Sequence, residues 1–149
     1  MVPRLGQVTK AEKGLIWWLI HEPGPALDAI ASVDASDLQG LASRSVLDLA
    51  WKLHENKGFS PSVLLERLSL VEAQLVTGIA SEPKPPALTP FSCVREFRRD
   101  RYERERADVQ REIERLQTEG AANGVEIDTL LMRKGDLGRL IQSLVLSEE

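Results

Sequence analysis

The stretch of residues 91–146 constrains the fold most, because its apolar residues recur at steps of three and four. That spacing is the period of an amphipathic α-helix, whereas a half-buried strand would need strict alternation. Gly120 and Gly124 interrupt the pattern, as the end of one helix and a tight turn before the next require. The stretch therefore predicts a long helical hairpin, whose first arm should reach roughly 40 Å at about 1.5 Å per residue.

The N-terminal half predicts six shorter helices, each with its own start or stop signal. Thr9 and Glu12 fit a capping box, and the first helix must end near His21 because prolines follow. Pro25 is expected to be the first residue of the second helix. The remaining signals are a cap at Asp34 or Ser36, a stop at Gly58, a start at Ser60 and Pro61, and an apolar stripe from Val71 to Ile79.

Residues 81–90 contain four prolines in ten positions, so a helix cannot cross them. This segment separates two predicted regions, a helical bundle over residues 1–90 with the connector 81–90 at its end, and the long helix and hairpin over residues 91–149. The predicted fold class is all-α: a six-helix bundle joined to a long C-terminal helical hairpin.

Composition narrows the functional classes. A net charge of −4 argues against a general polyanion binder, and no apolar run approaches the length of a membrane span. Cys93 is the only cysteine, so no intramolecular disulfide can form, and a cytoplasmic location is expected. His21 and His54 lack partners at metal-ligand spacing, and motifs such as GxSxG, HExxH or a glycine-rich phosphate loop are missing from the sequence. We therefore predict no catalytic, cofactor-binding or metal residue; an enzyme whose site such motifs miss is the remaining alternative.

Two surfaces of the hairpin are candidate binding sites. Basic and acidic residues alternate from Arg98 to Arg106, which is typical of a solvated helix face. The alternative interpretation is an arginine-rich nucleic-acid-binding helical module, although we expect weak or no direct binding of nucleic acid.

The second arm carries a broader apolar arc than the first, so part of that arc should face another partner. This partner could be the chain's own bundle, a second copy of the chain or another protein. Leu137 and Ile141 lie near the middle of the arc and should pack on the first arm, whereas Leu140 and Leu131 lie at its two rims. The predicted partner-binding residues are Leu131, Leu140, Leu144 and Val145.

The order of several segments resembles a known family over nearly the whole chain. The segments are EKGLIWWLIHEPGPAL, SRSVLDLAWKL, SPSVLLERL, VREFRRDRYERERADVQREIERLQ and LLMRKGDLGRLIQSLVLSEE. In this arrangement the chain resembles the C-terminal helicase-binding domain of bacterial DNA primase. The first three segments are also similar to the N-terminal domain of the replicative helicase, which stays an alternative.

The resemblance implies a module that recruits primase to the replicative DNA helicase for RNA primer synthesis. It also implies that the hairpin and the bundle contact the helicase's N-terminal domains, and that the zinc-binding and magnesium-dependent polymerising parts of a primase lie upstream. This sequence lacks the cysteines and the acidic metal-binding cluster of those parts, so we expect no primer synthesis from the chain alone.

Overall fold

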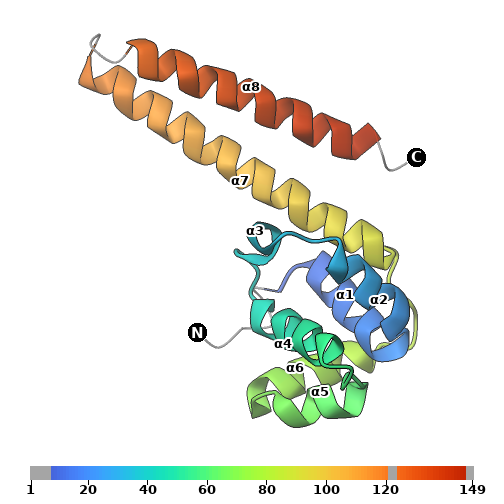
Figure 1. Cartoon of the computed structure of the whole chain (residues 1–149). Coiled ribbons are helices and arrows are strands. Elements are labelled where there is room, and N and C mark those ends of the chain that lie inside the picture. The colour runs from blue at the N-terminus through green and yellow to red at the C-terminus, as the bar shows by residue number, and fades with distance from the viewer. Residues whose placement is uncertain (1–7, 121–123, 147–149) are drawn as a thin grey trace. The chain divides into compact units, whose positions relative to one another are not determined.

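The computed structural model describes residues 8–120 and 124–146, with side chains up to Leu144. Within these ranges the chain forms helices and no strands, which confirms the all-α prediction (Figure 1). The chain divides into two compact units between Phe97 and Arg98. The division therefore falls inside a helix, later than the predicted end of the bundle at residue 90.

The first unit contains the six predicted short helices. They are α1 (Lys10–His21), α2 (Pro23–Ala31), α3 (Ala35–Leu38), α4 (Arg44–Glu55), α5 (Pro61–Arg67) and α6 (Leu70–Ala80). Helix α1 packs against α2 and α6, while α4 packs against α2 and α5. The first turns of α7 (Pro90–Glu119) also belong to this unit.

The core of the first unit is built around the apolar face of α1. Leu15, Ile16 and Leu19 are completely buried, and each such side chain contributes about 1.5–3 kcal/mol to folding. Helix α7 adds Cys93 and Phe97 to the same core, which explains why the unit extends past the proline-rich connector. Burial raises the pKa of the Cys93 thiol to about 12, so it stays protonated and unreactive at neutral pH.

Local capping explains where most helices begin. The Thr9 amide donates to the Glu12 carboxylate at 2.6 Å, and the Glu12 amide donates to the Thr9 hydroxyl at 3.2 Å, as predicted. Ser60 caps α5 by accepting the amide of Val63 at 3.2 Å. These bonds satisfy amides that the first turn of a helix leaves without partners.

Two predicted boundaries differ from the structure. Helix α2 begins at Pro23 rather than Pro25, because both prolines fit in a first turn whose amides have no intrahelical acceptor. Helix α4 is closed by Lys57, not Gly58: Lys57 adopts a left-handed φ of 57°. The Gly58 amide donates to the Leu53 carbonyl at 2.8 Å, completing a Schellman motif.

The second unit is the hairpin of α7 and α8 (Gly124–Leu146), which run antiparallel and side by side (Figure 1). The 30 residues of α7 correspond to about 45 Å at 1.5 Å per residue. Gly120 follows α7 with a φ of 114°, a conformation that other residues rarely adopt. Leu137 and Ile141 on α8 are buried, as predicted.

Candidate partner-binding surfaces

Helix α8 has adjacent buried and exposed leucines. Leu137 is completely buried, whereas Leu140, less than one turn later, is 39% exposed and Leu131 is 49% exposed. Leu144 is half-buried. The side chain of Val145, the fourth predicted partner-binding residue, lies outside the described side chains. Two of the four predicted residues therefore present large apolar surface, although their role in binding stays a prediction.

The exposed apolar residues of α8 do not form one patch that includes both Leu131 and Leu140. At 100° per residue, Leu131 and Leu140 lie on opposite rims of α8. Val125 and Met132, which are 81% and 73% exposed, lie on the side of Leu140. Val125, Met132 and Leu140 span about 80° of the helix, and we call them the α8 outer stripe. Sequence reasoning missed Val125 and Met132, although their seven-residue spacing was a signal for a shared face.

Polar contacts fix α8 alongside α7. The Arg133 guanidinium donates to the Glu105 carboxylate at 2.8 Å, and the Lys134 ammonium donates to the Gln110 side-chain oxygen at 2.6 Å. Both contacts join residues more than 20 positions apart in the sequence. They set which residues of α8 turn away from α7 and thus where the outer stripe lies.

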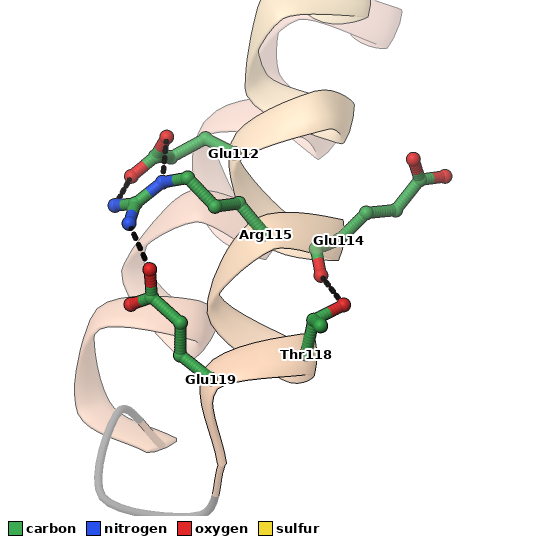
Figure 2. Close-up of polar contacts among 5 residues, drawn as sticks. All are labelled: Glu112, Glu114, Arg115, Thr118 and Glu119. Atoms are coloured by element: carbon green, nitrogen blue, oxygen red, sulfur yellow. Dashed lines mark hydrogen bonds and ion pairs between the residues drawn. The ribbon is translucent and has the colours of Figure 1, made fainter.

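An ion-pair cluster lies on the last turns of α7 near the hairpin turn. Figure 2 shows Arg115 between Glu112 and Glu119, with its Nε donating to Glu112 at 3.0 Å and its Nη1 donating to Glu119 at 2.7 Å. The hydrogen bond and charge of Glu112 raise the pKa of Arg115, and the hydrogen bond from Arg115 lowers the pKa of Glu112. Because the cluster is exposed, it contributes little to stability.

Two arginines of the arginine-rich run pair with glutamates one turn further along α7. Arg99 lies 3.4 Å from the Glu103 carboxylate, and Arg101 lies 3.7 Å from that of Glu105. The Arg101 guanidinium carbon is also 4.8 Å from the centre of the Tyr102 ring. These contacts favour the interpretation of a charge-balanced helix face, since two arginines of the run already lie beside carboxylates.

The first unit has a groove of about 710 Å³ between α1, α6 and the proline-rich connector, which we call the α1–α6 groove. Trp17, Val71, Leu75 and Ile79 are among its apolar lining residues. Lys10, Lys13 and Lys84 supply its positive charges. Sequence reasoning did not find this groove, because its walls come from segments about 60 residues apart.

Ring nitrogens on α1 hold the connector wall of the groove in place. The Trp17 indole N–H donates to the Glu82 carbonyl at 2.9 Å, and the Trp18 indole N–H donates to the Leu88 carbonyl at 2.9 Å. The His21 Nε2 lies 2.8 Å from the Ala80 carbonyl oxygen. Trp17 itself is buried. The two tryptophans thus fix residues 82–89, which lie outside the helices.

No group of three or more His, Cys, Asp or Glu side chains that could hold a metal ion occurs within residues 8–120 and 124–146. None of the helices in that part of the chain combines the length and apolarity that a bilayer crossing demands. Comparison with known proteins finds no family model, curated protein or solved structure that matches the chain.

Proposed function

We propose that this chain is the helicase-interaction module of a bacterial DNA primase. In this role it recruits primase to the N-terminal domain of the replicative DNA helicase for RNA primer synthesis. The arrangement of a helical bundle followed by a long helical hairpin supports the proposal, because the resemblance of the sequence segments implies that architecture. The chain itself supplies binding, and primer synthesis belongs to other parts of the primase.

The observation that carries the proposal is the contrast between Leu137 and Leu140. Leu137 is completely buried, whereas Leu140 is 39% exposed on the same helix. Together with Val125 and Met132, Leu140 leaves α8 with an apolar edge on the side that does not face α7. Exposed apolar surface gathered on one helix face is typical of a protein-binding site.

The proposed mechanism is the docking of an amphipathic helix into a helical partner. The α8 outer stripe would enter an apolar groove between helices of the helicase domain, while the charged face of α7 stays in water. Binding would tether the primase to the moving helicase and raise the effective concentration of primase at the newly unwound template.

The test is a binding titration of the purified chain against the N-terminal domain of the helicase from the same organism. We expect a saturable complex at physiological salt. The parallel titration uses single-stranded DNA, which we expect to bind weakly and to dissociate as salt rises through about 0.2 M.

Two results would favour the alternatives instead. Sub-micromolar DNA binding that is lost when Arg98, Arg101 and Arg104 become alanine would favour the nucleic-acid-binding module. Self-association of the chain without binding to the helicase would favour a helicase N-terminal domain.

A further inference from the structure

The α1–α6 groove has no role in the proposed docking of α8, and its lining residues all belong to the first unit. We propose that this groove is a second binding site, which receives an amphipathic α-helix with acidic flanks from a partner protein. The proposal does not rest on the docking of α8, because it uses different residues in a different compact unit.

The groove is suited to apolar side chains. Its lining includes the ring of Trp17, the side chains of Val71 and Ile79, and the rings of Pro85 and Pro86. Val71 is 45% exposed, so part of this apolar surface faces water in the isolated chain. Covering it with the apolar stripe of another helix would remove that surface from water.

The polar groups of the groove indicate a helix rather than an extended peptide. An extended peptide in an apolar groove needs hydrogen-bond partners for its own amides and carbonyls. The Trp17 indole N–H, a natural donor for that purpose, is already bonded to the Glu82 carbonyl at 2.9 Å. An α-helix satisfies its own backbone and needs no such donors from the groove.

The charges around the groove indicate acidic flanks on that helix. The groove is lined by three exposed lysines, Lys10, Lys13 and Lys84, and by a single carboxylate, Glu82. This local excess of positive charge contrasts with the net charge of −4 for the whole chain. None of the three lysines forms an ion pair with another residue in the part of the chain that the structure describes. Lys10 and Lys13 lie on one face of α1, because they are three residues apart. Carboxylates beside the apolar stripe of the bound helix would complement these lysines.

Gly78 provides a way to block the groove without disturbing the fold. It lines the groove within α6, and a Cβ atom placed there would meet no heavy atom within 4 Å. Gly78→Leu therefore places a side chain in the groove, while leucine is also a better helix former than glycine. The matched control is Gly138→Leu, because Gly138 lies in α8 with equally open surroundings.

The experiment measures binding of a synthetic amphipathic helix of about four turns. This peptide carries leucines at helical spacing, with glutamates on both flanks of the leucine stripe. A second peptide has lysines in place of the glutamates. Each is titrated by fluorescence anisotropy against the full chain and its variants, and circular dichroism verifies that every variant is folded.

We expect the glutamate peptide to bind the parent chain and Gly138→Leu alike, and at least about tenfold more tightly than the lysine peptide. Gly78→Leu should weaken binding by more than about tenfold through a steric clash. The double charge reversal Lys10→Glu, Lys13→Glu should reverse the preference between the two peptides. It is compatible with folding because acidic residues are favourable in the first turn of a helix.

Several outcomes would overturn the proposal. One is equal binding of both peptides, and another is equal binding to the parent chain and Gly78→Leu. A third is tighter binding of single-stranded DNA, lost on the lysine reversals, which would assign these lysines to nucleic acid. Finally, sedimentation of a parent dimer that Gly78→Leu abolishes would identify the occupant as a second copy of the chain.

Discussion

The contacts that stabilise the first compact unit internally differ in kind from those within the hairpin. In the first unit the important polar contacts are long-range: Glu12 bonds to Ser43, and Trp18 bonds to the carbonyl of Leu88, which is 70 positions away. In the hairpin most of the ion pairs are exposed and join residues three or four positions apart, such as Arg111 with Asp108. The first unit thus has a buried polar framework, while the hairpin depends on a narrow apolar seam.

This difference separates the residues that maintain the fold from those available for binding. A residue of the first unit such as Leu15 is enclosed on all sides by other helices. A single helix covers α8 within the hairpin, so its other sides stay exposed at Met132 and Leu140. We therefore expect substitutions in the buried framework to affect stability, and substitutions on the outer face of α8 to affect binding.

The largest effect in this comparison is expected for Glu12. Its carboxylate is completely buried and accepts hydrogen bonds from the Ser43 amide at 2.9 Å and the Ser43 hydroxyl at 2.8 Å. Glu12→Ala leaves both buried donors without an acceptor, and we expect it to lower the free energy of unfolding by about 3 kcal/mol. Urea unfolding followed by circular dichroism measures the change.

Two variants serve as controls for Glu12→Ala. Glu12→Gln keeps a side-chain oxygen that can accept from Ser43, so its cost should be less than half as large. Glu105→Ala removes the hairpin ion pairs with Arg133 and Arg101, in which the Glu105 side chain is exposed, and should cost no more than about 1 kcal/mol. Equal losses for Glu12→Ala and Glu105→Ala would contradict the contrast between the units.

A smaller and opposite effect is expected at Lys57, which closes α4 with a φ of 57°. Glycine adopts this left-handed conformation without steric cost, so Lys57→Gly should stabilise the first unit by about 1 kcal/mol. Lys52→Gly, within α4, should instead destabilise it by about 0.5–1 kcal/mol. The two urea midpoints should move in opposite directions, and a shift of the same sign in both would show that the cap does not control α4.

Acidification should weaken the first unit slightly through Glu72. Burial alone would raise the pKa of the Glu72 carboxyl, but hydrogen bonds from Ser45 and Ser69 outweigh it and lower the pKa below 4.5. Its stabilising contribution is therefore present above the unfolded-state pKa and is lost as pH falls through the lower folded-state pKa. We expect Glu72→Gln to reduce the dependence of the melting temperature on pH below about 4.5. An unchanged dependence would contradict this assignment.

The smallest effect is expected for Arg115, despite its contacts with Glu112 and Glu119 (Figure 2). The cluster is exposed and screened by solvent, so Arg115→Ala should move the urea midpoint less than any of the substitutions above. The difference from the parent chain should also shrink as salt is raised from 0.05 to about 0.5 M. A loss of stability as large as that of Glu12→Ala would show that exposed pairs do hold the hairpin together.

Local signals explain what could be predicted from the sequence. The capping box at Thr9 and the start at Ser60 depend on residues within one turn, so their positions are visible in the chain order. The bond from Glu12 to Ser43 and the groove between α1 and α6 depend on segments that only folding brings together. Lys57 took the place expected for Gly58, because the Schellman hydrogen bonds, not the residue type, decided which residue became left-handed.

The most direct test of the account compares Leu140→Asp with Leu137→Asp. Leu140 is exposed on the α8 outer stripe, so a charge there should change stability by only about 0.5 kcal/mol but weaken binding to the helicase N-terminal domain. Leu137 is completely buried, and truncation alone at such a site typically costs about 2–5 kcal/mol, so Leu137→Asp should lower both the melting temperature and binding. The measurement pairs a thermal melt with a binding titration on each variant. If Leu140→Asp unfolds the chain, or binds the helicase as tightly as the parent, the outer stripe is not the binding surface.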